Sequence, residues 1–200
     1  GDICVQGECV ADPGPSLVLN GSLTVSSSED VETANQYKEI TGDLEITGAV
    51  PGETILPYLE KVGGRLWVHG AKGLVEISFP KLLSIGTSLE VQKNEVLERM
   101  SAPVLGAIGS ELHLSELPKC YQIDFAALTN VGTDLRVHQV DGITNLIFNG
   151  LVNVPGDVQI QSMGGLKIVN LSQVETIGGS LTLESNSELT TLHLDGLKVV

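Results

Sequence analysis

Aromatic and basic residues are both scarce in this sequence of 200 residues. Aromatic side chains make up 4% of the chain against 42% for all hydrophobic residues, so a buried core has to be built from Leu, Ile and Val. Lys and Arg number 11 against 25 acids, and they form no cluster. The formal charge of −14 repels polyanions, so neither nucleic acid nor an anionic membrane surface is an expected partner.

Long hydrophobic runs are absent as well. No segment approaches the about 20 apolar residues that cross a bilayer, so membrane insertion is not expected. Two of the three cysteines lie in GDICVQGECVADPGP, residues 1–15, which we treat as a leader preceding residues 16–200. Cys4 and Cys9 flank a turn-forming Gly7, which favours a small disulfide loop in an oxidising compartment. Pairing with cysteines outside this sequence, or free thiols, are the alternatives.

What the sequence does contain is a repeat with a constant period. Six blocks of 23 residues run without a gap from Gly63 to Val200, and blocks of 21 and 22 residues from Asn20 and Thr41 precede them. Apolar residues return at places four, six, twelve, fifteen, seventeen and twenty, and a β-branched residue closes every block. Place four holds Leu23, Leu44, Leu66, Leu89, Leu112, Leu135, Val158 and Leu181.

The apolar places four and six are separated by polar places, which is the two-residue period of a half-buried strand. Strands that recur once per block can pair only in parallel, stacked along the axis of a solenoid. The sequence therefore predicts one mainly β solenoid domain over residues 16–200, with eight coils of about 23 residues and little or no α-helix. Cys120 shares place twelve with Leu97 and Ile143, so we expect a buried core thiol there.

The run ISFPKLLSIGTSLEV, Ile77–Val91, and its variants LVNVPGDVQI and VETIGGSLTL resemble the receptor L-domain. This is the leucine-rich-repeat-like, right-handed parallel β-helix of insulin-receptor and EGF-receptor ectodomains, with related repeats in fungal cell-wall and secreted bacterial proteins. The resemblance covers Leu17–Val200 and implies a right-handed solenoid at the cell surface or outside the cell. A cysteine-containing leader before acidic, glycine-rich coils resembles a secreted bacterial member more than an animal receptor.

Places three, five and seven of each block point outward and form one regular face, which is where solenoids commonly bind partners. Trp67, the only tryptophan, is flanked there by Arg65 and His69, and we expect its ring to be largely exposed. An exposed Trp beside Arg is typical of a binding hot spot, although it can equally cover the sheet beneath it. The predicted binding face consists of Arg65, Trp67, His69, Glu90, His113, Arg136 and His138.

Three acids, Glu111, Asp134 and Asp157, follow one another at place three. They are a candidate calcium ladder, or acids of a glycan-active β-helix, against the simpler interpretation of a solvated ladder eased by Arg136. Coils of constant length leave no insertion to wall a cleft, and no catalytic motif appears, so we expect no enzyme activity and no required cofactor.

The sequence therefore indicates a non-catalytic, extracellular or cell-surface recognition module with an unknown protein or glycan ligand. A carbohydrate-binding or glycan-active β-helix, with calcium as a potential cofactor, and a passive structural spacer are the alternatives. The last coil closes on Val200 without a polar cap, so we expect either that the natural chain continues or that it self-associates through this C-terminal edge.

Overall fold

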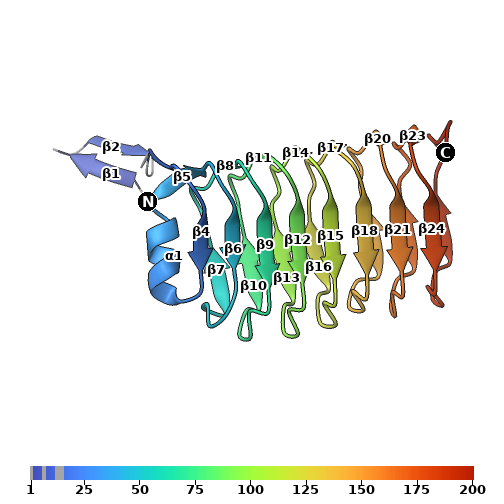
Figure 1. The fold of residues 1–200 in the computed structure, drawn as a ribbon, viewed down its shortest axis with the longest axis horizontal. Helices are drawn as coiled ribbons and strands as arrows, with labels where there is room; N and C mark the ends of the chain where they lie inside the picture. Colours follow the sequence, from blue (N-terminus) through green and yellow to red (C-terminus); the bar gives the residue numbers. More distant parts are fainter. Residues whose placement is uncertain (1, 6–7, 12–15) are drawn as a thin grey trace.

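The chain forms a parallel β-solenoid of eight coils, as the repeat predicts (Figure 1). A computed structural model describes the backbone of residues 2–5, 8–11 and 16–200, and the side chains from residue 16 onward. Residues 23 apart, such as Leu66, Leu89 and Leu112, pair across successive strands, so each coil repeats the path of the previous one. The expectation of a mainly β solenoid with coils of about 23 residues is confirmed.

Three walls of parallel strands enclose the core. Sheet 1 contains β3 (Leu17–Leu19), β5 (Tyr37–Ile40), β8 (Lys61–Val62), β11 (Ser84–Ile85), β14 (Ala107–Ile108), β17 (Asn130–Val131), β20 (Asn153–Val154) and β23 (Thr176–Ile177). Sheet 2 contains β4 (Leu23–Val25), β6 (Leu44–Ile46), β9 (Leu66–His69), β12 (Leu89–Gln92), β15 (Leu112–Ser115), β18 (Leu135–His138), β21 (Val158–Gln161) and β24 (Leu181–Glu184).

The third wall is made of two shorter sheets. One contains β7 (Glu53–Ile55), β10 (Glu76–Ser78), β13 (Arg99–Ser101) and β16 (Gln122–Asp124). The other contains β19 (Asn145–Ile147), β22 (Ile168–Asn170) and β25 (Thr191–His193).

The core is a continuous column of Leu, Ile and Val, because the repeated apolar places of all three walls point inward. In β9, β12, β18 and β21 the residues alternate strictly between buried and half-buried. Cys120 is fully buried in this column, as expected, and burial raises the pKa of its thiol to about 11. A thiol with this pKa stays protonated near neutral pH and is a poor nucleophile.

Two asparagines at place nine, the buried Asn94 and the half-buried Asn186, form hydrogen bonds between neighbouring coils. Asn94 accepts the amide hydrogen of Ala71 at 3.0 Å and donates to the carbonyl oxygens of Val68 and Gln92. Asn186 repeats this arrangement, accepting from the amide of Met163. The asparagine contacts typical of leucine-rich repeats are therefore made in two coils, and apolar residues fill the same place in the others.

A single helix, α1 (Ser28–Ala34), lies in the first coil, beside β4 (Figure 1). Ser27 is its N-cap, and the Asp30 carboxylate accepts hydrogen bonds from the Ser26 amide and from the hydroxyls of Ser26 and Ser27. Val31 and Ala34 pack against the first coils of the core. The N-terminal end of the core is thus covered by a helix.

The last coil is more open than those before it. Its inward-facing Leu181, Leu183, Leu189, Leu194 and Leu197 are only half-buried, whereas the equivalent residues of the coil before it are buried. In the leader, β1 (Asp2–Val5) pairs antiparallel with β2 (Glu8–Ala11), and this register sets the backbone of Cys4 opposite that of Cys9. The side chains of both cysteines lie outside the described residues, so their disulfide stays a prediction.

One pair of neighbouring coils is joined by fewer backbone hydrogen bonds than most other pairs. Elsewhere, most successive coils are joined by backbone bonds equivalent to Glu98 N–Val75 O, Ala102 N–Asp124 O and Leu83 N–Glu60 O. Between the coil at 109–131 and the coil at 132–154, the equivalent bonds from Thr144 N, Phe125 N and Val152 N are absent within residues 16–200. Pro155 also has no amide hydrogen to donate at this step. We call this step the seam.

Sheet 2 stays continuous across the seam, with four residue pairs between β15 and β18, while sheet 1 keeps one pair and the third wall none in the described chain. Two buried phenyl rings, Phe125 and Phe148, follow each other at place seventeen here, whereas Phe79 is followed by the small Ala102. Two adjacent rings need more room than an alternation of large and small side chains. The coils therefore meet closely along sheet 2 and separate on the opposite side.

Candidate binding face

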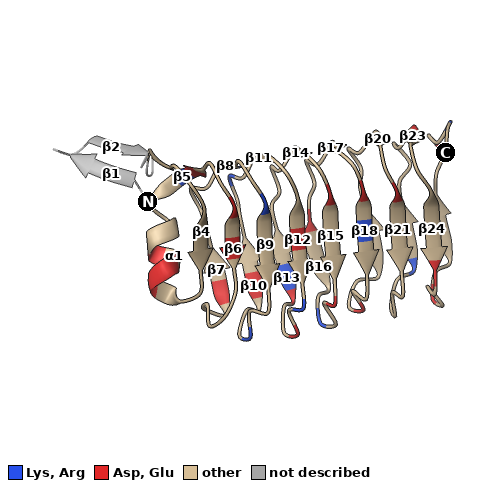
Figure 2. Cartoon of the chain, viewed as in Figure 1, with Lys and Arg blue, Asp and Glu red and all other residues tan. Residues whose placement is uncertain are grey.

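The outer face of sheet 2 carries all seven residues of the predicted binding face. The register aligns Trp67, Glu90, His113 and Arg136 in one row across β9, β12, β15 and β18. Figure 2 shows acidic residues recurring at the start of several strands of this sheet, with only a few basic residues among them. The side chains on this face form two clusters, one around Trp67 and one around Arg136 and His113.

Trp67 is the centre of the first cluster. The His69 ring stacks on the indole at 3.6 Å between centroids, and the Arg65 guanidinium lies 4.3 Å from the ring centroid. These neighbours leave Trp67 half-buried, so the expectation of a largely exposed ring is wrong. The indole Nε1 is shielded from solvent and has no hydrogen-bond partner among the described residues.

Ion pairs surround the Trp67 cluster. His69 Nε2 lies 2.8 Å from Glu45 Oε1, and Arg65 lies 3.7 Å from a carboxylate oxygen of Glu90. The hydrogen bond from His69, followed by one from Thr24, lowers the pKa of Glu45. The orientation of His69 on the indole is therefore fixed from both sides, by stacking and by a carboxylate.

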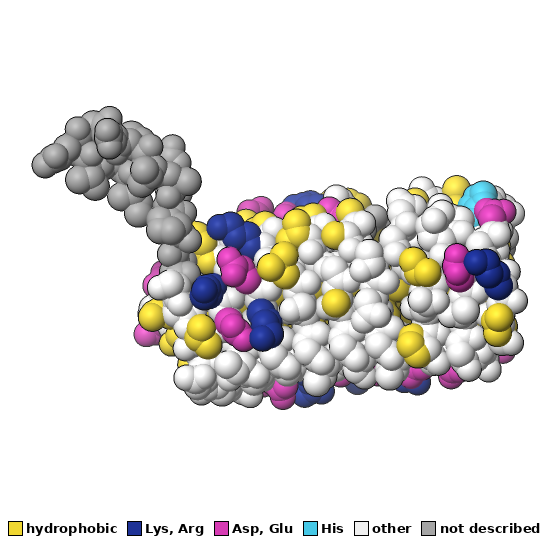
Figure 3. All heavy atoms as spheres, turned by 90° about the horizontal axis from the view of Figure 1, so that it is seen from above, with side chains coloured by type: hydrophobic (Ala, Val, Ile, Leu, Met, Phe, Trp, Pro, Cys, Tyr) yellow, Lys and Arg dark blue, Asp and Glu magenta, His cyan; other side chains and the backbone are white. Residues whose placement is uncertain are grey.

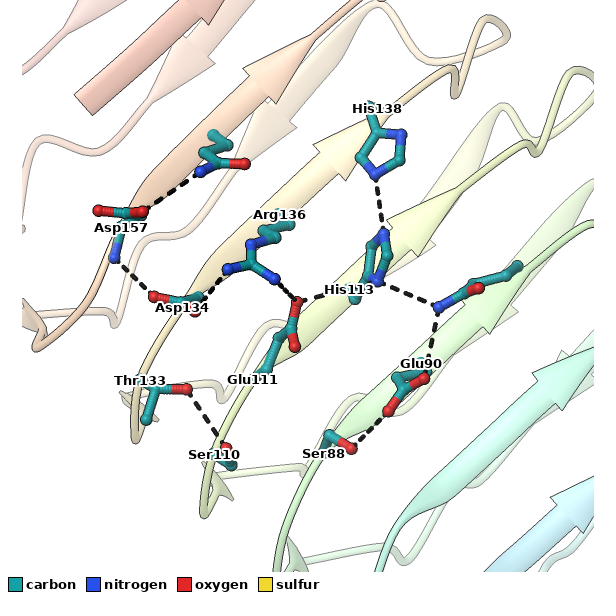
Figure 4. A network of polar contacts seen from close by, with 12 residues as sticks. Ser88, Glu90, Ser110, Glu111, His113, Thr133, Asp134, Arg136, His138 and Asp157 are labelled. Carbon is teal, nitrogen blue, oxygen red and sulfur yellow. Dashed lines mark hydrogen bonds and ion pairs between the residues drawn. The ribbon is translucent and has the colours of Figure 1, made fainter. Parts of the chain in front are cut away.

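The second cluster begins with a chain of hydrogen bonds that crosses β12, β15 and β18 (Figure 4). The Gln92 amide lies 3.4 Å from Glu90 Oε2 and 3.0 Å from His113 Nδ1, and His113 Nε2 lies 2.8 Å from His138 Nε2. Burial, and then the nearby His113, lower the pKa of His138. His138 is therefore neutral near pH 7 and can accept the His113 hydrogen bond.

Arg136 organises the acids of the same cluster. Its two terminal nitrogens donate to Glu111 Oε1 at 2.9 Å and to Asp134 Oδ2 at 2.8 Å (Figure 4). Asp157 lies one strand further, where the Gln159 amide approaches one of its carboxylate oxygens at 3.3 Å. The acids predicted as a calcium ladder are thus engaged one by one with protein donors. No group of three or more His, Cys, Asp or Glu within residues 16–200 is arranged to hold a metal ion.

The aspartates at place three have a structural role that sequence reasoning missed. The Oδ1 atom of Asp134 accepts the amide hydrogen of Asp157 at 2.7 Å, and Asp157 Oδ1 accepts that of Ser180 at 2.8 Å. A Cβ atom at Gly156 or Gly179 would overlap with these carboxylate oxygens. Each aspartate thus interlocks with the backbone of the next coil only because a glycine leaves room for it.

The sequence carries a signal for this interlock. Glycine stands at place two of the next coil after Ser22, Asp43, Asp134 and Asp157, at Gly42, Gly64, Gly156 and Gly179. After Arg65, Ser88 and Glu111 the same place holds Thr87, Ser110 and Thr133. The signal is found by comparing place three of one coil with place two of the next. A comparison of place three in all coils does not show it.

The other surfaces of the molecule offer less. A hollow at the corner after sheet 2 is lined by Lys93, Glu95, Glu116, Pro118, Gln139 and Asp141. Seen from above, the molecule shows hydrophobic side chains scattered over the described surface and charged ones gathered towards its two ends (Figure 3). The exposed hydrophobic side chains include Leu83 and Val104.

Comparison with models of protein families, with curated protein sequences and with solved structures finds no match. In the part of the chain that the structure describes, no helix has the length and apolar character needed to cross a membrane. The fold and the arrangement of polar side chains on sheet 2 therefore carry the functional argument.

Proposed function

We propose that this chain is a non-catalytic, extracellular or cell-surface recognition module that binds a protein or glycan through the outer face of sheet 2. The observation that carries the proposal is the Trp67 cluster. It places the only indole of the chain, one Arg and one His within stacking distance on a regular face. Trp and Arg are the residues most enriched at binding hot spots. The resemblance of the repeat to the receptor L-domain supports the same kind of role.

Glycan hydrolysis or a calcium-dependent carbohydrate module is less well supported. Arg136 and the backbone of the next coil already occupy oxygens of Glu111, Asp134 and Asp157. Recruiting these carboxylates for Ca²⁺ or for proton transfer would compete with Arg136 and, at Asp134 and Asp157, with the hydrogen bonds to the next coil. A passive spacer requires no ligand at all and is the outcome that a silent face would favour.

A screen against a glycan array and a panel of extracellular proteins, with and without Ca²⁺, tests the proposal. Replacement of Trp67 by alanine should abolish any hit, and Trp67→Phe should retain part of it because a ring remains. Thr182→Ala, at the same place five of a distant coil, is the matched control and should leave binding unchanged. A hit that survives Trp67→Ala and needs Ca²⁺ would instead support the carboxylate alternative, and silence would support a spacer.

A further inference from the structure

The contact between His113 and His138 joins the two coils of the seam. His113 belongs to β15 and His138 to β18, the only strands that keep four residue pairs at this step. The two Nε2 atoms face each other at 2.8 Å, and the rings are tilted by 37° with 4.9 Å between centroids (Figure 4). Both rings are half-buried on the outer face of sheet 2, where solvent still reaches them.

The hydrogen-bond chain assigns the proton between the two rings. The Gln92 amide nitrogen approaches both the Glu90 carboxylate and His113 Nδ1, so Nδ1 accepts a hydrogen bond and the His113 proton sits on Nε2. That proton is donated to the free lone pair of His138 Nε2. A metal ion that displaced this proton would take the place of the hydrogen bond, and each ring would turn to direct its Nε2 lone pair at the ion.

The separation of the two nitrogens suits a shared metal ion. Two nitrogens at a usual metal distance of about 2.0–2.1 Å, with an angle between 90° and the tetrahedral value, lie about 2.8–3.4 Å apart. The observed 2.8 Å falls at the lower end of this range. When Nε2 binds metal, the His113 proton moves to Nδ1, which then turns from the Gln92 amide towards Glu111 Oε1, 3.8 Å away, as its hydrogen-bond acceptor.

The charges around the pair favour a cation. Glu90 of β12 pairs with His113 in the register, Glu111 directly precedes β15, and Glu116 follows it. On β21 the outward Gln159 and Gln161 are uncharged, and the acid Asp157 precedes the strand. Arg136 is the one nearby base, and its charge is shared between Glu111 and Asp134. These carboxylates attract a cation towards the two imidazole nitrogens.

We propose that Nε2 of His113 and Nε2 of His138 bind one divalent transition-metal ion of the kind that prefers imidazole, such as Zn²⁺, Ni²⁺ or Cu²⁺. The ion joins β15 to β18 and strengthens the seam on the side where its coils already meet. The remaining coordination positions hold water. If the proposed function holds, a carboxylate or imidazole of the partner can replace this water and bind the ion on the binding face.

Titration of the full chain with Zn²⁺ or Ni²⁺ alone, followed by calorimetry, tests the site without any partner. A Cys4→Ser, Cys9→Ser background removes competing thiolates. We expect one ion per chain and at least tenfold weaker binding in His113→Gln and in His138→Gln. Glutamine fits both places, because Gln159 shares place five with His113, and Gln92 and Gln161 share place seven with His138. His69→Gln and His193→Gln, which change histidines outside the pair, should bind within twofold of the parent.

Hydrogen exchange gives the second readout. The ion should slow exchange of the amides of β15 and β18 in the parent chain and leave it unchanged in His113→Gln. The site would be overturned if the parent binds no ion, or if His113→Gln and His138→Gln bind as tightly as the parent. Loss of binding in His193→Gln would also overturn it. Binding that leaves β15 and β18 unprotected would overturn its role at the seam. These experiments contain no partner, so a negative result does not contradict the proposed recognition function. That function is tested separately by Trp67→Ala.

Discussion

Replacing Gly179 by serine tests the interlock between neighbouring coils. Asp157 Oδ1 accepts the Ser180 amide at 2.8 Å, and a Cβ at Gly179 would overlap with this oxygen. The new side chain must therefore push the carboxylate away from the amide. A hydrogen bond to a charged group contributes about 1.5–3 kcal/mol, so we expect Gly179→Ser to lower the free energy of unfolding by about 2 kcal/mol. In a chain of this size that corresponds to about 4–8 °C in Tm.

The repeat itself supplies the compensating change. Ser88 at place three is followed by Ser110 at place two of the next coil, so this pair of serines is compatible with the coil geometry. Asp157→Ser removes the carboxylate and, with it, the hydrogen bond and the closest overlap, so that only the Gly156 carbonyl group remains within 3.0 Å of the new Cβ. We therefore expect Gly179→Ser to cost at least about 1.5 kcal/mol less in the Asp157→Ser background than in the parent chain.

Urea denaturation followed by circular dichroism measures all four members of this cycle. Ser110→Ala is a control at the same place in a coil without the interlock, and it should change stability by no more than about 0.5 kcal/mol. Equal costs of Gly179→Ser in both backgrounds would refute the reasoning. In that case the glycine would be required by the backbone path alone.

Three further predictions concern the seam, a histidine and the last coil. The amides of Phe125, Thr144 and Val152 should exchange hydrogen at least about tenfold faster than those of Ala102, Glu98 and Leu83, because they lack the recurring bonds; equal protection in exchange mass spectrometry would contradict the seam. The pKa of His138 lies below 6.5 in the folded chain, so the unfolded chain binds more protons just below pH 6.5 and stability falls as pH drops through this window. Denaturation at several pH values should show this slope in the parent and a shallower one in His138→Gln, and identical slopes would disprove it. Light scattering should detect association of the 200-residue chain that Leu183→Glu abolishes; a parent that stays monomeric at all concentrations would rule out pairing through the last coil.

The repeat could be predicted from the sequence because the buried positions of every coil are apolar at the same places. Leu66, Leu89 and Leu112 each return to the same wall, and a shift of one residue would turn a whole strand inside out. Constant coil length and the two-residue alternation therefore predict the sheets and their register together. The outward set, including Trp67 and His113, follows from the same alternation.

Contacts between different columns were harder to predict. Arg136 meets Glu111, and His138 meets His113, across a diagonal of 25 residues, which is one coil plus two positions. A reading along each column places His113 beside Glu90 and Arg136 and gives no reason to pair it with His138. The direction of long side chains, and not their place in the repeat, decides these contacts.

Helix α1 and the seam departed from the expected pattern for a different reason. A helix of seven residues is too short to show a helical period, although Ser27 followed by Asp30 is a capping signal. The seam depends on the size of adjacent core residues, since Phe125 and Phe148 are both acceptable at an apolar place. A pattern of polar and apolar residues carries no information about side-chain size, so it cannot predict the effect of two large rings in adjacent coils.

The two clusters on sheet 2 are therefore not equivalent as binding sites. Around Arg136 and His113, the strongest contacts run between β15 and β18, where the backbone on the other walls is incompletely joined. This cluster joins the two coils of the seam whether or not a partner binds. The Trp67 cluster lies where the hydrogen bonding between coils is complete, and the indole nitrogen gains no partner from the described chain. The contacts between coils do not use the indole nitrogen, so the proposed recognition role rests on Trp67 more than on the Arg136 and His113 cluster.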